Sequence, residues 1–254
     1  MSIEFINDQD LDQLHDKFQL ATPFRHVVID DFFRHDVAMQ LLGEFPDYDS
    51  NVWNAHYNSP LENKKTCDHW LKFPKLTYQV FWYLCSLEFE GIVERITGHQ
   101  RVHADIGLHG AGWHAHANSG KLNMHLDYSL HPKLGLERHY NLIIYLTPNW
   151  DIKWGGGLEL WDHNTETNQP SECKQLIENR FNRAVLFDTT QNSWHGLPKD
   201  LTCPPGVIRR SLAMYYLTDP DVTATDRPRA KFAPYGEQAE DPEILRLIEK
   251  RQRL

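Results

Sequence analysis

The chain has 254 residues, of which 41% are hydrophobic and 24% charged, and its net charge at neutral pH is −9. This composition is typical of a globular protein with a sizeable core. The acidic balance, with no Lys/Arg cluster, argues against a broad nucleic-acid or anionic-membrane surface. The sequence contains no run of 18 apolar residues, so we expect no transmembrane helix and no membrane partner.

The cysteines indicate a reducing compartment. They are far apart, form no CxxC pair and suit free thiols: Cys67, Cys85, Cys173 and Cys203. The first residues also lack the basic and apolar regions of a secretory signal. We therefore expect a cytoplasmic protein.

The N-terminal third is predicted to be largely helical. Apolar residues recur on a helical period at 8–19 and 35–45, and a buried strand with an acidic end lies between them at 24–33. Residues 47–72 are polar and are expected to be irregular. Residues 74–98 begin at a proline, end at a glycine and predict one long helix or a broken one.

The pattern of apolar residues changes after residue 100. Short apolar runs alternate with Gly, Pro and Asn turns, which is typical of the strands of a sandwich or barrel, at 141–147, 157–162, 183–190 and 209–218. Helical periodicity returns at 241–254. We expect a mainly β protein in which a helical N-terminal layer packs on a barrel-like core within a single domain, 1–254.

Two His-x-Asp triplets occur in this chain of 15 histidines. They are His125-Leu126-Asp127 and His103-Ala104-Asp105. On a strand, residues i and i+2 point to the same side, so either triplet presents an imidazole and a carboxylate together. A non-haem Fe(II) site needs two imidazoles and one carboxylate, with the third ligand coming from a distant strand.

The downstream sequence favours His125 and Asp127. His195 lies seventy residues on, in a predicted loop after the strand 183–190, and a strand that opens with two arginines follows it. The other triplet lacks this order of elements. Its histidine is interpreted as a polar group at the start of a strand.

Residues 100–218 resemble the Fe(II)/2-oxoglutarate-dependent dioxygenase superfamily, in its prolyl-4-hydroxylase-like branch. The matching motifs occur in family order: His125-Leu126-Asp127, Tyr145-Leu146-Thr147, Gly155-Gly156-Gly157, His195, and Arg209 or Arg210. The resemblance implies a double-stranded β-helix, or jelly-roll (cupin-like), core at 100–218. Residues 1–99 would be a helical support and residues 219–254 a C-terminal extension.

The resemblance also implies roles for individual residues. His125, Asp127 and His195 would hold the iron. An arginine would pair with the distal carboxylate of 2-oxoglutarate, where a bidentate fork suits a planar anion. The family spacing of a small residue and then an aromatic favours Arg209, with Ser211 and Tyr215, over Arg210.

Two further cosubstrate residues follow from the same resemblance. Tyr145 matches a tyrosine whose hydroxyl helps to hold the cosubstrate carboxylate, and Ile143 shares its strand face. A core tyrosine with a satisfied hydroxyl is the alternative. The glycine turn is interpreted as structural.

The implied cofactors are Fe(II), 2-oxoglutarate and O₂, with ascorbate as a candidate accessory. The implied reaction hydroxylates a C–H bond and releases succinate and CO₂. A carboxylate at Asp127 favours hydroxylation over halogenation, which needs room for a halide. The alternatives are a cupin-like metal-dependent isomerase or a non-catalytic metal- or ligand-binding protein.

The substrate is expected to be a polar small molecule or a peptide. A free amino acid or small metabolite ranks first and a prolyl residue of a protein second. Four histidines near the predicted site could line a substrate loop or an exposed polar loop: His109, His114, His116 and His131. No motif indicates an oligomeric state.

Overall fold

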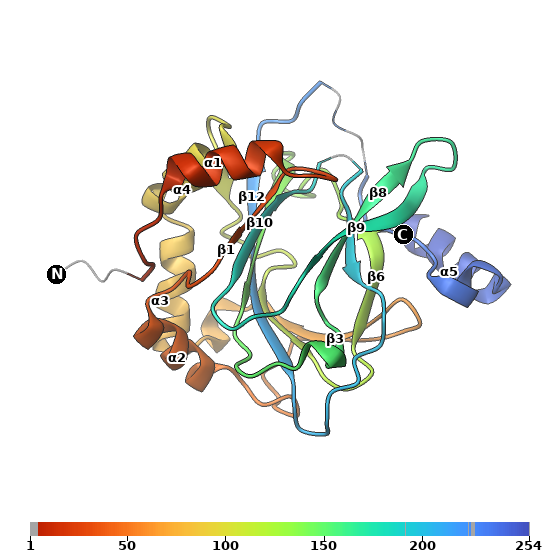
Figure 1. The fold of residues 1–254 in the computed structure, drawn as a ribbon, viewed down its shortest axis with the longest axis horizontal. Helices are drawn as coiled ribbons and strands as arrows, with labels where there is room; N and C mark the ends of the chain where they lie inside the picture. The colour runs from red at the N-terminus through yellow and green to blue at the C-terminus, as the bar shows by residue number, and fades with distance from the viewer. Residues whose placement is uncertain (1–4, 191, 223, 225–226, 254) are drawn as a thin grey trace.

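Thirteen strands form one continuous antiparallel sheet in the computed structural model, which describes residues 5–190, 192–222, 224 and 227–253. The sheet rolls up into a barrel-like jelly roll with helices outside it (Figure 1). The expected mainly β fold with a double-stranded β-helix core and flanking helices is therefore confirmed.

Ten strands follow one another across the sheet. In spatial order they are β1 (His26–Ile29), β10 (Ala184–Asp188), β7 (Glu137–Tyr145), β12 (Arg209–Thr218), β5 (Gly112–His116), β3 (Glu62–Cys67), β6 (Lys121–Leu126), β11 (Trp194–Leu197), β8 (Leu158–Asn164) and β9 (Gln169–Ile177). Three short strands join its sides: β2 (Ala55–Asn58) on β3, β4 (His103–Ala104) on β12 and β13 (Lys231–Phe232) on β6. Strand β3 pairs with both β5 and β6 and so links the two halves of the roll.

Four helices cover one outer face of the roll, and a fifth lies near the C-terminus on the other side (Figure 1). They are α1 (Leu11–Leu20), α2 (His35–Glu44), α3 (Lys75–Leu84), α4 (Leu87–Thr97) and α5 (Pro242–Arg253); three 3₁₀ turns are η1 (Trp70–Lys72), η2 (Ile152–Trp154) and η3 (Gly236–Ala239). None of the described helices is long and apolar enough to cross a bilayer.

The predicted helix over 74–98 is broken into α3 and α4. The Ser86 side chain accepts a hydrogen bond from the Phe89 amide at 3.3 Å and so caps the second helix. Gly98 ends that helix in the left-handed conformation, at φ 73°. The break turns the chain so that both helices present apolar faces to the sheet.

Alternation along the strands separates a helix-facing core from the interior of the roll. On β7, Leu142 and Ile144 belong to the large cluster under the helices, whereas Tyr145 belongs to a smaller cluster on the other face. On β12, Leu212 and Met214 likewise face the helices. The strand period of two thus leaves every second residue of these strands for the interior.

Residues 47–72 were expected to be irregular, but this segment supplies strands β2 and β3. The sequence of these strands is polar and lacks apolar alternation, because Glu62, Lys64 and Thr66 face a polar cavity rather than an apolar core. The N-terminal third therefore contributes three strands to the roll as well as helices.

Buried hydrogen bonds join the N-terminal strand segment to the roll. The Asn182 side chain accepts from the Phe33 amide at 2.9 Å and donates to the Phe33 carbonyl at 2.7 Å. Strand β1 then pairs along β10. These contacts anchor the N-terminal segment directly to the sheet that carries the site.

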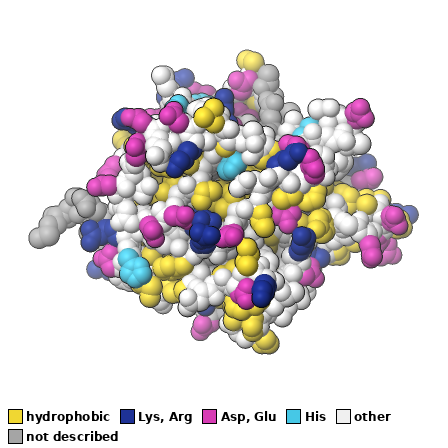
Figure 2. Space-filling model, in the orientation of Figure 1, with side chains coloured by type: hydrophobic (Ala, Val, Ile, Leu, Met, Phe, Trp, Pro, Cys, Tyr) yellow, Lys and Arg dark blue, Asp and Glu magenta, His cyan; other side chains and the backbone are white. Residues whose placement is uncertain are grey.

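Charged side chains are mixed over the surface seen in Figure 2. On that face the Lys and Arg side chains are scattered between acidic ones, and no broad basic patch is visible there. The mixture of charges on this face accords with the net charge of −9.

Candidate metal and cosubstrate site

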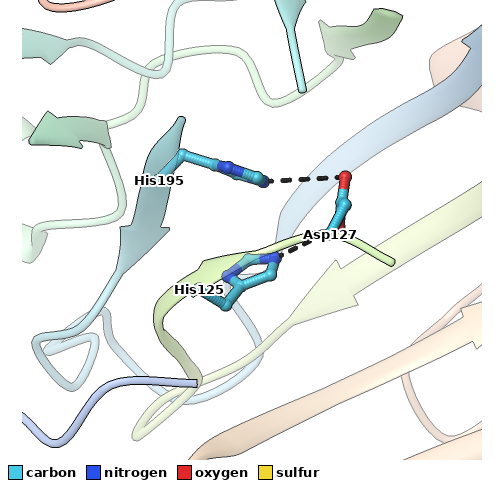
Figure 3. Close-up of side chains that lie close together, drawn as sticks. All are labelled: His125, Asp127 and His195. Carbon is cyan, nitrogen blue, oxygen red and sulfur yellow. Dashed lines mark ion pairs between the residues drawn. The ribbon is translucent and has the colours of Figure 1, made fainter. Parts of the chain in front are cut away.

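Two neighbouring side chains, His125 and Asp127, meet the distant His195 inside the roll (Figure 3). His125 lies on β6, Asp127 directly follows that strand, and His195 lies on the neighbouring β11, not in the predicted loop. The Asp127 carboxylate is 3.5 Å from His125 Nε2 and 3.9 Å from His195 Nε2. One ligand atom from each residue falls within 4.8 Å of the others.

Backbone carbonyls orient both imidazoles. His125 Nδ1 donates to the Asn123 carbonyl at 2.9 Å, and His195 Nδ1 donates to the Ser193 carbonyl at 2.8 Å. Because a carbonyl can only accept, the protons lie on Nδ1 and the lone pairs on Nε2. Both lone pairs thus point towards the carboxylate, as metal-binding histidines require.

Two of the donors, His195 and Asp127, also have the charge states that a metal ion needs. Burial and the neighbouring His125 lower the pKa of His195 to about 4, so this imidazole is neutral at pH 7. Burial raises the pKa of Asp127, but its neighbours His125, His195 and Arg138 outweigh burial, and the net pKa is lowered. The Asp127 Oδ2 atom is buried without a hydrogen-bond partner.

The competing triplet does not form such a site. The His103 side chain is exposed on β4, while Asp105 is buried and accepts hydrogen bonds from the Gly107 and His109 amides at 3.0 and 3.1 Å. Among the described residues, only the set built on His125 brings together three metal-binding side chains.

Beyond the three donors, Arg209 points into the roll. It is 2% exposed, and its Nε donates to the Gly156 carbonyl at 2.7 Å. Gly156 has φ 78°, and a Cβ there would come within 3.1 Å of Arg209 Cδ, so the glycine turn permits this approach. Within the described part of the chain, Arg209 makes no ion pair.

The neighbouring Arg210 points the other way. Its guanidinium donates to the Ile208 carbonyl at 3.4 Å and lies over the Phe45 ring at 5.9 Å. Alternation along β12 places Arg209 and Ser211 at the cavity, whereas Arg210 does not line it. A shift of one residue would reverse this assignment.

Tyr145 lies beside Arg209 with an unsatisfied hydroxyl. The Arg209 guanidinium is 4.9 Å from the ring centroid, and the buried Tyr145 hydroxyl makes no hydrogen bond of regular geometry with the described residues. Burial raises the pKa of this tyrosine, so its hydroxyl keeps a proton to donate. Ile143 and Ser211 line the adjacent cavity.

The cavity has a volume of about 340 Å³ and extends from Arg209 past the three donors to the surface. Sequence reasoning missed several residues of its outer part, where Tyr57 and Glu62 from the β2–β3 hairpin and Arg251 from α5 line the wall. The sequence around these residues, in an expected loop and in a terminal helix, gives no local indication that their side chains line a cavity.

Arg138 is the most buried cation at this outer part that sequence reasoning overlooked. It is 3% exposed, and its guanidinium lies 3.6 Å from the Tyr128 ring centroid and 3.5 Å from that of Tyr215. It donates to the Tyr128 hydroxyl and the His109 carbonyl, while its Nε has no partner. Arg138 precedes the predicted strand 141–147 and lies on the longer observed β7, so the sequence prediction did not place it on a strand.

The four histidines left open by the sequence differ in position, and His109 lies in an exposed turn. His114 and His116 lie on β5 and line the cavity, and His109 lines it as well. His131 is buried, with Nε2 at 3.7 Å from Asp105 Oδ2.

The residues fit Fe(II) and 2-oxoglutarate. Two imidazoles and one carboxylate are the donor set of a non-haem iron site with open positions. A buried guanidinium without a counter-ion and an unpaired tyrosine hydroxyl match a carboxylate.

Known proteins share both the sequence pattern and the fold. Residues 111–217 match the sequence model of the 2OG-Fe(II) oxygenase superfamily. No curated protein sequence matches the chain significantly.

Solved structures of similar fold include prolyl hydroxylases. A Pseudomonas putida prolyl-4-hydroxylase is 14% identical, with a TM-score of 0.57 over 82% of this chain and 100% of that one. A Trichoplax adhaerens prolyl hydroxylase, solved with a hypoxia-inducible-factor peptide fragment, is 16% identical, with a TM-score of 0.55 over 82% and 91%. At this identity the likeness establishes the fold.

Proposed function

We propose that the protein hydroxylates an unactivated C–H bond of a small polar substrate. Residues 111–217 belong to the 2OG-Fe(II) oxygenase superfamily, so the chain is a 2-oxoglutarate-dependent oxygenase. The observation that carries this proposal is the meeting of His125, Asp127 and His195 in a cavity that also holds Arg209, which forms no ion pair with the described residues. A free amino acid or small metabolite is the first candidate.

In this proposal the protein holds and orients the reactants. His125, Asp127 and His195 hold Fe(II), while Arg209 and the Tyr145 hydroxyl bind the distal carboxylate of 2-oxoglutarate. Ile143 and Ser211 border that cosubstrate. When bound, the iron and 2-oxoglutarate supply oxidative chemistry that consumes O₂ and yields succinate and CO₂.

The outer cavity supports a polar substrate. Arg138 offers a planar cation stacked between two tyrosines, which suits a carboxylate, and Glu62 offers an anion on the β2–β3 side. A volume of about 340 Å³ lies near the small end of ligand pockets. A prolyl residue in a protein is the second candidate, motivated by the shared fold.

A cupin-like isomerase or a simple binding protein is not favoured. Neither would require a buried arginine without a counter-ion beside a complete set of iron ligands. That arrangement is costly to the fold unless an anion is bound.

The first test is anaerobic titration of the metal-free protein with Fe(II) and then 2-oxoglutarate. We expect a weak visible charge-transfer band from the chelate, which is lost in His195→Ala. Succinate release is then measured with free amino acids, small metabolites and proline-containing peptides. Iron binding without a band would overturn the cosubstrate assignment, and release stimulated only by peptides would reverse the substrate order.

A further inference from the structure

His116 is a fully buried histidine whose ring has no partner. The residue is 2% exposed, and neither Nδ1 nor Nε2 forms a hydrogen bond with a described residue. Its side chain lines the same cavity as the three metal-binding side chains. Since buried polar atoms left unpaired are costly, such a ring indicates a ligand that completes its hydrogen bonds.

The position of His116 shows which part of the cavity that ligand occupies. On the paired strands β5 and β12, the Cα atoms of His116 and Arg209 face each other directly. Arg209 is buried and forms no ion pair within the described residues, and the Tyr145 hydroxyl beside it is unpaired. Three groups able to bind an anion therefore gather at one end of the cavity.

The ring is available as a neutral donor. Burial, and then the positive charges of Arg209 and Lys64, hold the pKa of His116 well below its usual range. A neutral imidazole keeps one N–H, which can donate to a carboxylate oxygen without a second full charge beside Arg209.

The neighbouring His114 is a matched comparison. It lies two residues earlier on the same strand and also lines the cavity. Its Nε2, however, hydrogen-bonds to the Gly110 carbonyl at 3.2 Å, so its ring already has a partner within the protein.

We infer that the His116 ring donates a hydrogen bond to the distal carboxylate of 2-oxoglutarate, alongside Arg209. This inference rests on the proposed function and adds to it a cosubstrate-binding residue. His116 would then contribute to the preference for a five-carbon dicarboxylate over shorter 2-oxo acids.

The test compares two 2-oxo acids in two protein backgrounds. The dissociation constants of 2-oxoglutarate and of 2-oxobutanoate, which lacks the distal carboxylate, are measured anaerobically on the Fe(II) protein through the charge-transfer band. The variants are His116→Leu, His116→Asn and His116→Gln, with His114→Gln as the control. Metal affinity and melting temperature are recorded for each.

We expect His116→Leu to weaken 2-oxoglutarate binding by about 10- to 100-fold, the usual effect of losing a hydrogen bond to a charged group. Binding of 2-oxobutanoate and of the metal should stay within about twofold of the parent. One of the two amide variants should bind 2-oxoglutarate more tightly than His116→Leu, because its N–H replaces that of one ring nitrogen. His114→Gln should bind both acids like the parent.

Three results would overturn the inference. They are unchanged 2-oxoglutarate affinity in His116→Leu, equal losses for both acids, and an equal loss in His114→Gln. If His116→Leu does not fold, failure of both amide variants to differ from the parent also counts against it. The absence of a band in the parent protein would instead refute the proposed function, so the two failures are distinguishable.

Discussion

His125 and His195 face each other across two paired strands. Their Cα atoms are direct partners in the antiparallel β6–β11 ladder, and their ring centroids are 4.3 Å apart. A single register between two strands thus places both imidazoles on one side, and Asp127, two residues after His125, completes the set. A slip of one residue would move one ring to the opposite face of the sheet.

Replacing any of the three donors should abolish metal-dependent turnover. His125→Ala, Asp127→Ala and His195→Ala each leave two ligands, so we expect Fe(II) affinity to fall by at least about 100-fold. The measurements are metal binding by equilibrium dialysis and succinate release. His103→Ala is the control and should bind iron normally; loss of iron in that variant, with His125→Ala intact, would show that the wrong triplet was chosen.

Arg209 and Arg210 should differ sharply in their effect on the cosubstrate. Arg209→Ala removes a buried guanidinium from the cavity, so the KM for 2-oxoglutarate should rise by about 100-fold or more. Arg210→Ala removes a side chain that points away from the cavity and should change this KM less than about threefold. Steady-state kinetics with varied 2-oxoglutarate measure both, and the opposite order would contradict the register seen here.

Arg138 should govern substrate affinity rather than cosubstrate affinity. Arg138→Lys keeps the positive charge but loses the planar fork that stacks between Tyr128 and Tyr215. Once a substrate is found, we expect its KM to rise by about tenfold with the 2-oxoglutarate KM unchanged. An equal rise in both constants would argue against a substrate-binding role.

Asn182 should stabilise the contact between the N-terminal strand segment and the roll. Asn182→Ala removes two buried hydrogen bonds to Phe33 and should lower the free energy of unfolding by about 2–4 kcal/mol. Asn168 is a matched control because it also has positive φ, 53° against 61°, but is exposed. Urea unfolding of both alanine variants separates the hydrogen bonds from backbone strain, and equal losses would assign the effect to strain alone.

The metal-free protein should be less stable in mild acid. His195 has a pKa of about 4 in the folded state because of burial and the nearby His125, against about 6.5 when unfolded. Between these values the unfolded chain binds more protons, so the free energy of unfolding falls as the pH drops from 6.5 towards 4. At pH 5 this single group should cost about 2 kcal/mol.

Urea unfolding in the presence of a chelator at pH 7 and pH 5 measures that loss. His195→Gln removes the titrating group, so the difference between the two pH values should shrink. Lowered pKa values at His114 and His116 act in the same direction. Equal stability of the parent protein at both pH values would contradict the expected protonation states.

Much of the site was predictable because its signals are local. The period of a strand alone places His125 and Asp127 on one side, and it separates Arg209 from Arg210 once the direction of one of them is known. The helices were recognisable from apolar periodicity and, for residues 74–98, from the starting proline and the final Gly98, whereas the Ser86 cap that divides this segment was seen only in the structure. The jelly-roll class and the superfamily followed from the order of the motifs along the chain.

Tertiary structure decided what depends on partners distant in the sequence. The hairpin β2–β3 has a polar sequence because one of its faces lines a cavity. Strand β3 is defined by its pairing with β5 and β6, which are distant in the sequence. His195 extends β11 because β6 and β8 lie on either side of it. The missing partners of His116 and the stacking of Arg138 arise from residues brought together by folding, and local periodicity carries no information about such long-range contacts.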